Sequence, residues 1–254
     1  MTVGKIFAAG RPALIGYLPA GFPTVEGGIE AITAMVDAGV DAVEVGFPYS
    51  DPVIDGPVIQ RATEAALAAG VRPADVLRTV ERVAALGVPA VVMTYWNPME
   101  RYGVARFARD LAAAGGAGLI TPDLIPDEAG EWIAASDEHG LDRIFLVSPS
   151  STEARVRSTT AACRGFVYAT ALMGVTGARD QVSSDAPALV ERVRAVTRTP
   201  VAVGLSVRDG AQAAAIGAFA DGVIVGSALV AALAEGGIAA VAALTADLAA
   251  GVRA

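Results

Sequence analysis

The stretch AGVDAVEVGFPYSDPVIDGP, residues 38–57, contains the signals that decide the fold. Ala38 and Gly39 are a pair of small residues typical of a helix end, and the apolar run Ala42–Gly46 that follows has the length of a strand. Apart from Glu44, its hydrophobic residues are continuous rather than alternating, as expected for a parallel strand covered on both faces. A loop rich in proline and glycine comes next. The stretch therefore predicts one helix–strand–loop unit of an α/β fold.

The same unit recurs along the chain, because seven further apolar runs alternate with helical patterns. The expected strands are residues 13–18, 42–46, 90–94, 118–120, 143–147, 165–169, 201–204 and 222–225. The expected helices are residues 27–38, 61–69, 73–85, 105–114, 127–136, 186–197, 210–218 and 238–248, the first of them capped by Thr24. Eight strand–helix units in 254 residues give about 32 residues per unit, the period typical of a (β/α)₈ barrel.

An open, doubly wound sheet is the alternative with the same alternation. That fold commonly carries a GxGxxG turn after its first strand, and no such turn follows residues 13–18. No linker, charge block or low-complexity segment divides the chain, so we expect residues 1–254 to form a single (β/α)₈ barrel domain. In such barrels the chemistry lies at the C-terminal ends of the strands.

The composition excludes several functions. Hydrophobic residues make up 54% of the chain and charged residues 18%, which is far from the composition of a disordered protein. A formal net charge of −8 argues against nucleic-acid binding. His139 and Cys163 are single residues of their types, too few for a zinc cluster. No apolar run reaches the roughly 18 residues that span a bilayer and no signal peptide is recognisable, so we expect a cytoplasmic protein without a membrane partner.

Glu44 is an acidic residue within an apolar strand, close to the strand end where barrel enzymes do their chemistry. Burial of an unpaired carboxylate is costly and raises its pKa, which suits the group to proton transfer near neutral pH. Asp51 and Asp55 follow on the long loop. The alternative is equally compatible with the residue types: Glu44 forms an ion pair with an arginine inside the barrel, and the loop is only a turn.

Three glycine-bearing turns late in the chain could hold a phosphate, at residues 174–179, 204–206 and 225–228. The last two follow the seventh and eighth strands, where barrels often bind phosphate with backbone amides at the start of a short helix. They could also be ordinary strand-to-helix turns. At the end of the third strand, the rings of Tyr95 and Trp96 could line an apolar pocket or simply pack in the core.

Together these motifs resemble the signature of the tryptophan synthase α subunit family, and the resemblance extends over residues 17–230, nearly the whole chain. It rests on Glu44, Gly46, residues 48–52 and 55–57, and the turns at residues 174–177 and 226–228. Members of the family are (β/α)₈ barrels that cleave indole-3-glycerol phosphate to indole and glyceraldehyde 3-phosphate. They act with a β subunit that joins indole to serine by means of pyridoxal phosphate.

The resemblance implies a role for each residue of these motifs. Glu44 is expected to be the general acid/base at indole C3 and at the glycerol C3 hydroxyl, and Asp55 to accept a hydrogen bond from the indole N–H. The substrate pocket is expected to include Tyr17, Tyr95, Ile120, Leu146, Tyr168, Thr176 and Leu205, and the phosphate site Gly177, Ser206, Gly226 and Ser227. The implied assembly is αββα, with the pyridoxal phosphate in the β subunit and neither a cofactor nor a metal in this chain.

The residue content agrees with this chemistry. Cleavage of a carbon–carbon bond needs an electron sink, and Lys5, the only lysine, precedes the first strand, which disfavours a Schiff base. The remaining sink is the substrate's own indole ring, protonated at C3, for which two carboxylates suffice. Two alternatives stay open: a stand-alone lyase that releases free indole, and a barrel that mainly regulates a β partner. A generic phosphosugar isomerase would leave the loop of residues 48–52 unexplained.

Overall fold

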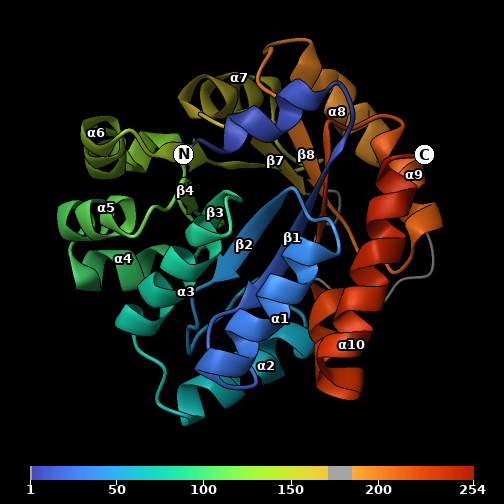
Figure 1. Cartoon of the computed structure of the whole chain (residues 1–254). Helices are drawn as coiled ribbons and strands as arrows, with labels where there is room; N and C mark the ends of the chain where they lie inside the picture. The colour runs from blue at the N-terminus through green and yellow to red at the C-terminus, as the bar shows by residue number, and fades with distance from the viewer. Residues whose placement is uncertain (1, 171–184) are drawn as a thin grey trace.

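The computed structural model describes residues 2–170 and 185–254, in which parallel strands form one sheet surrounded by helices (Figure 1). The strands are β1 (Ala13–Pro19), β2 (Ala42–Gly46), β3 (Ala90–Met93), β4 (Gly118–Ile120), β5 (Asp142–Ile144), β6 (Leu146–Val147), β7 (Val167–Thr170), β8 (Val201–Gly204) and β9 (Gly222–Val225). They coincide with the eight expected strands to within two residues, apart from one division described below. The predicted (β/α)₈ barrel is confirmed.

The two ends of the sheet, β5 and β6, together form the fifth strand of the barrel and so close it. Its order is β5-β4-β3-β2-β1-β9-β8-β7-β6, and β5 and β6 are consecutive in the chain, separated by Phe145 alone. Arg164 N donates to Arg143 O at 2.8 Å, and Tyr168 N donates to Phe145 O at 3.2 Å, which joins this broken strand to the segment that contains β7. The single strand predicted at residues 143–147 is therefore two short segments that occupy one barrel position.

The eight expected helices are present with shifted ends, and Thr24 Oγ1 caps α1 by accepting from Gly27 N at 3.0 Å. Two helices were not expected: α4 contains Pro98, and α7 buries only Val156, Thr159 and Thr160, so no apolar stripe marks it. The described helices are α1 (Val25–Asp37), α2 (Pro57–Ala68), α3 (Pro73–Ala85), α4 (Trp96–Tyr102), α5 (Val104–Ala113), α6 (Gly130–His139), α7 (Glu153–Ala162), α8 (Asp185–Arg194), α9 (Gly210–Gly217), α10 (Ser227–Val252) and the 3₁₀ helices η1 (Val3–Ala9) and η2 (Pro126–Glu128).

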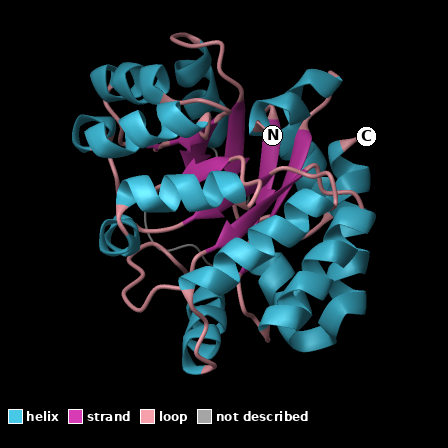
Figure 2. Ribbon diagram, turned by 60° about the vertical axis from the view of Figure 1, so that its left-hand side comes forward, coloured by secondary structure: helices cyan, strands magenta, loops and turns pink. Residues whose placement is uncertain are grey.

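Helices surround the strands (Figure 2), and the alternation of side chains along the strands divides the core into two layers. Val43 and Val45 of β2 point outward into the large cluster between the strands and the helices. Ala42 belongs to the smaller cluster inside the barrel, and Glu44 points the same way, into the barrel mouth. The strand register therefore decides that the carboxylate, and not a valine, faces the interior.

The helix η1 closes the N-terminal end of the barrel. Val3 is buried in the inner cluster, and its amide donates to Asp142 Oδ2 at 2.7 Å. Phe7 lies against Phe166, with ring centroids 5.8 Å apart. Lys5 is exposed on this helix, at the end of the barrel opposite to the strand ends where the chemistry was predicted. Its position agrees with the argument against a Schiff base.

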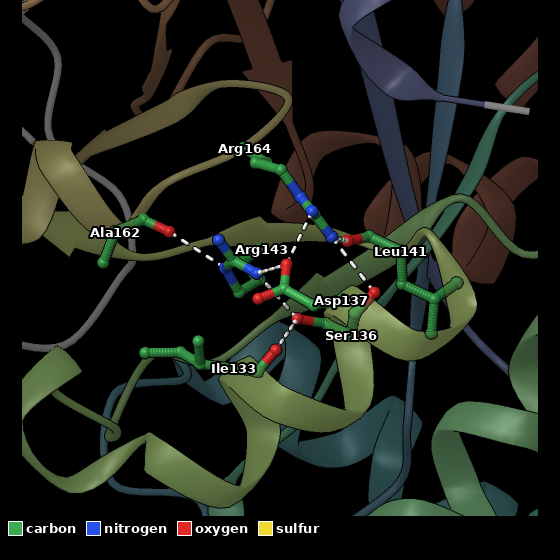
Figure 3. Close-up of polar contacts among 7 residues, drawn as sticks. All are labelled: Ile133, Ser136, Asp137, Leu141, Arg143, Ala162 and Arg164. Carbon is green, nitrogen blue, oxygen red and sulfur yellow. Dashed lines mark hydrogen bonds and ion pairs between the residues drawn. The ribbon is translucent and has the colours of Figure 1, made fainter.

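Two arginines tie the C-terminal ends of α6 and α7 to the fifth strand (Figure 3). Arg143 donates to Ala162 O at 3.1 Å and to Ser136 Oγ at 3.0 Å. Arg164 donates to Ser136 O at 3.0 Å, and both guanidinium groups pair with Asp137. The last carbonyls of a helix lack partners within the helix, and a cation there also opposes the negative end of the helix dipole. We interpret this cluster as a structural one, which stabilises the chain next to the division between β5 and β6.

Among the described helices, α10 has the length and mean hydropathy (1.9) of a membrane span, which the sequence patterns did not lead us to expect. Its backbone is not helical at Gly237, where φ is 66° and ψ is −160°. Neither half of α10 therefore reaches the about 20 residues that cross a bilayer. Since α10 packs against α9, α1 and β1, we interpret it as a helix of the barrel's outer layer.

Candidate active site

A cavity of about 460 Å³ opens at the C-terminal ends of the strands, a size suited to a small ligand. Several strands contribute to it: Tyr17 on β1 and Glu44 on β2 are partners in the parallel register, as are Leu146 on β6 and Tyr168 on β7. The predicted site residues that line the cavity are Tyr17, Glu44, Asp55, Leu146, Tyr168, Leu205, Ser206, Gly226 and Ser227.

Glu44 is almost completely buried in this cavity, with 1% of its surface exposed. Its Oε1 atom has no hydrogen-bond partner among the described residues. No arginine or lysine of residues 2–170 and 185–254 lines the cavity, so the alternative of an internal ion pair finds no support there. A buried carboxyl group without a partner atom is costly in a purely structural role, and it is the arrangement expected of a group reserved for a ligand.

Burial raises the pKa of Glu44 to about 8, and the nearby charge of Asp55 adds to the shift. Loss of hydration disfavours the charged form of an acid, so the protonated form of Glu44 predominates at neutral pH. A carboxylic acid with its pKa near the working pH can both give and take a proton, which is the requirement for general acid/base catalysis.

Asp55 lies on the loop between β2 and α2, about half-buried at the edge of the same cavity. Burial raises its pKa, and a hydrogen bond from Tyr95 acts in the opposite direction. The backbone of the loop is held by Gln60 Nε2, which donates to Asp55 O at 2.9 Å. The site therefore brings together two carboxyl groups from different elements, and the structure places both where the sequence motifs predicted them.

Two glycines make room for the tyrosines that cross the barrel mouth. A Cβ atom at Gly46 would lie 2.4 Å from the Tyr17 hydroxyl, and one at Gly204 would lie 2.3 Å from the Tyr168 hydroxyl. Any side chain at these positions would displace the rings. Burial raises the pKa of both tyrosines well above the usual value, so they line the cavity as neutral groups.

Another part of the cavity wall is built from the turns that follow β8 and β9. Helix α10 begins at Ser227 after Gly226 and has no acidic residue in its first turn, and no side chain of the described residues caps its first amides. Leu205 and Ser206 contribute the neighbouring wall. Free amides at a helix N-terminus attract anions through their hydrogen-bonding capacity and the helix dipole. This end of the cavity is therefore suited to a phosphate group.

Four predicted site residues are not found in the cavity wall. Ile120 is fully buried in the inner cluster of the barrel and does not line the cavity, although β4 ends at that residue. Tyr95 occupies the N-cap position of α4, and its hydroxyl contacts Asp55 on the loop between β2 and α2. Thr176 and Gly177 lie outside the described residues, as does the whole turn of residues 174–179.

The cavity also has lining residues that the sequence motifs did not indicate. They include Ile59 on α2, Met93 at the end of β3, Pro122 after β4 and Thr170 at the end of β7. Met93 and Thr170 could have been found by the rule that strand ends face the site. Nothing in the local pattern marks Ile59 or Pro122.

The fold and this cavity define a (β/α)₈-barrel enzyme with its site at the C-terminal ends of the strands. A sequence model of the family described as tryptophan synthase alpha chain matches residues 4–250. The chain belongs to that family: it is a lyase of tryptophan biosynthesis that cleaves indole-3-glycerol phosphate.

Known relatives and solved structures agree with this assignment. The tryptophan synthase alpha chain of Salinispora arenicola is 67% identical over 254 residues, which cover 98% of this chain and 95% of the relative. A structure of Mycobacterium tuberculosis tryptophan synthase is similar with a TM-score of 0.95 at 62% identity, covering 99% of this chain and 98% of that one. A mutant tryptophan synthase alpha-subunit from Pyrococcus furiosus still gives a TM-score of 0.85 at 31% identity, over 94% and 98% of the two chains.

Proposed function

We propose that Glu44 is the general acid/base of the lyase reaction and that it acts alternately on indole C3 and on the glycerol C3 hydroxyl. The observation that supports this proposal is the burial of its carboxyl group in the cavity, where none of the residues that the structure describes is a partner for Oε1. With its pKa raised to about 8, the group starts the reaction protonated. Transfer of that proton to ring C3 gives an iminium, and the carboxylate then takes the hydroxyl proton as the carbon–carbon bond breaks into the ring.

Asp55 complements this cycle by accepting a hydrogen bond from the indole N–H. Positive charge develops at that nitrogen when C3 is protonated, so a carboxylate beside it stabilises the transition state more than the ground state. Asp55 must be ionised for this role while Glu44 is protonated. The two groups share one cavity but differ in burial, and at Asp55 a hydrogen bond from Tyr95 opposes the rise in pKa that burial causes.

The substrate phosphate binds, in this proposal, on the amides of Gly226 and Ser227, with Ser206 and the Ser227 hydroxyl beside it. The position of the α10 N-terminus supports this assignment, since Gly226 and Ser227 line the cavity and the first amides of a helix are available to an anion. Gly177 is proposed as a further contact from outside the described residues. No basic side chain is required at such a site, because backbone donors supply the positive potential.

Replacement of Ser227 by Asp is expected to raise the KM for indole-3-glycerol phosphate at least about tenfold, with a smaller change in kcat. An acidic residue is favourable at the start of a helix, so the fold should persist, while the added charge repels the phosphate. Steady-state kinetics measure the effect. Ser227→Asn is the matched control, because it has nearly the same size as Asp and no charge; equal KM values for the two variants would contradict the phosphate assignment.

The family and its solved tryptophan synthase structures support a complex with a β subunit. We propose that this complex is the αββα assembly and that its pyridoxal phosphate belongs to the β subunit. For this chain we propose catalysis without a cofactor or metal, in the cytoplasm. Its single histidine and single cysteine support the absence of a zinc site, and its exposed Lys5 lies away from the cavity.

The decisive experiment measures indole formed from indole-3-glycerol phosphate by the purified chain, with and without an added β subunit. We expect turnover by the chain alone and a substantially higher rate when the β subunit is present. An unchanged rate would favour the stand-alone lyase. No turnover under either condition would overturn the catalytic proposal and favour a mainly regulatory barrel.

A further inference from the structure

The proposed role of Asp55 requires its carboxylate to point at the substrate ring, although the residue lies on a loop. Gln60 holds only the backbone carbonyl of Asp55. The side chain has a different contact: Tyr95 Oη lies 3.3 Å from Asp55 Oδ2 and donates a hydrogen bond to it. This distance is longer than that of an average hydroxyl–carboxylate bond, as is common at catalytic residues before the substrate binds.

The direction of this hydrogen bond follows from a second contact of the same hydroxyl. Ile54 N donates to Tyr95 Oη at 3.0 Å. A phenol has one hydrogen and can also accept, so the amide of Ile54 occupies a lone pair and leaves the hydrogen for the carboxylate. One side chain thus fixes both the backbone before Asp55 and one of its two carboxylate oxygens.

The side chain of Tyr95 is itself held in place by burial and by its neighbours. It is buried, with 6% of its surface exposed, and its backbone lies at the N-cap position of α4. Its ring lies 5.4 Å from the ring of Tyr49, whose hydroxyl accepts from Asn97 Nδ2 at 2.9 Å. Tyr95 does not line the main cavity, but it contacts two residues that do, the carboxylate of Asp55 and the backbone of Ile54. Of these two contacts, the one with Asp55 reaches a carboxylate.

We propose that Tyr95 is a positioning residue for the lyase reaction: it holds Asp55 Oδ2 so that Oδ1 faces the N–H of the bound indole ring. This inference rests on the proposed role of Asp55. It assigns Tyr95 a function different from the substrate contact that the family resemblance implied.

The hydrogen bond also has a measurable electrostatic consequence. It favours the charged form of Asp55 and so opposes the rise in pKa that burial causes. Among the described lining residues, the other titratable groups are Glu44 on β2, Tyr17 on β1 and Tyr168 on β7. Removal of the Tyr95 hydroxyl leaves these three in place, so the pKa of Asp55 should rise and the acid limb of the pH profile should move to higher pH.

The test compares Tyr95→Phe with Tyr102→Phe in the full-length chain, with indole-3-glycerol phosphate as substrate. Tyr102 is a matched control because its hydroxyl also donates to an aspartate, Asp110 Oδ2 at 2.7 Å, away from the cavity. We expect Tyr95→Phe to lower kcat about 10- to 100-fold with a smaller change in KM, and to shift the acid limb of kcat/KM upward. Tyr102→Phe should leave both unchanged.

A double-mutant cycle with Asp55→Asn separates the possible outcomes. If Tyr95 acts through Asp55, Tyr95→Phe should have almost no further effect in the Asp55→Asn background. An equal loss in both backgrounds would indicate general damage to the fold and overturn the inference. A fully active Tyr95→Phe beside an inactive Asp55→Asn would overturn the inference alone, whereas a fully active Asp55→Asn would overturn the proposed role of Asp55.

Discussion

Replacement of Glu44 by Gln is expected to lower the rate of indole formation by at least about 10²–10⁴-fold, the contribution of a well-placed general acid/base. The amide has nearly the same shape as the carboxylic acid but cannot deliver a proton to ring C3. Because the phosphate contacts are unaffected, the KM should change much less than kcat. Steady-state assays on the purified chain measure both constants.

Glu64→Gln provides the matched control for this experiment. Glu64 is exposed on α2, and the same substitution there should leave the activity unchanged. Near-full activity of Glu44→Gln, with the control also active, would contradict the catalytic role of Glu44.

The same substitution should change how stability depends on pH. Between about 4.5 and about 8 the folded chain retains a proton on Glu44 that the unfolded chain has lost, so the free energy of unfolding falls as the pH rises through this window. The wild-type chain is expected to lose at most on the order of 5 kcal/mol in this way, and Glu44→Gln should lose none of it. Denaturant unfolding at pH 5 and pH 9 tests the difference.

Replacement of Asp55 by Asn is the second large effect that we expect, a loss of at least about 10²-fold in kcat. The amide keeps the size of the side chain but cannot balance the positive charge that develops on the indole ring. Single-turnover measurements should place the loss in the cleavage step, because the carboxylate interacts more strongly with the transition state than with the bound substrate.

Asp51→Asn is the control on the same loop. Asp51 is exposed, its carboxylate accepts from Ser50 Oγ at 2.6 Å, and it does not line the cavity. Its substitution should leave kcat of the isolated chain unchanged. Equal losses for Asp51→Asn and Asp55→Asn would indicate that the loop as a whole, and not the carboxylate of Asp55, supports catalysis.

The fold was predictable because parallel strands buried on both faces stand out as short, continuous apolar runs. The two carboxyl groups were predictable for a related reason, since Glu44 interrupts such a run and Asp55 follows it on a long loop. The division of the fifth strand at Phe145 could not be predicted, because the apolar run of residues 144–147 continues through it. Helix α7 was not predicted either, because its sequence is mostly polar and its apolar residues do not recur with the period of a helix.

The sequence predicted less well which inward-pointing residues near the strand ends reach the cavity. Ile120 and Leu146 both point inward near strand ends, but only Leu146 reaches the cavity. Which inward layer reaches the mouth is set by the stagger between strands, and no local pattern records it. Tyr95 does not line the cavity because β3 ends at Met93 and helix α4 begins at Trp96. The sequence did not indicate a helix start there, because Pro98 follows two residues later.

A titration of the Glu44 carboxyl group tests most directly whether Glu44 is the proton donor of the lyase reaction. Carbon-13 NMR of the chain labelled at its glutamate carboxyl groups can follow this signal, which is assigned by its loss in Glu44→Gln. We predict a midpoint near pH 8, as burial in the cavity requires. A midpoint near 4.5, the ordinary value for a solvated glutamate, would contradict the proposal that this chain keeps a protonated acid ready for the substrate ring.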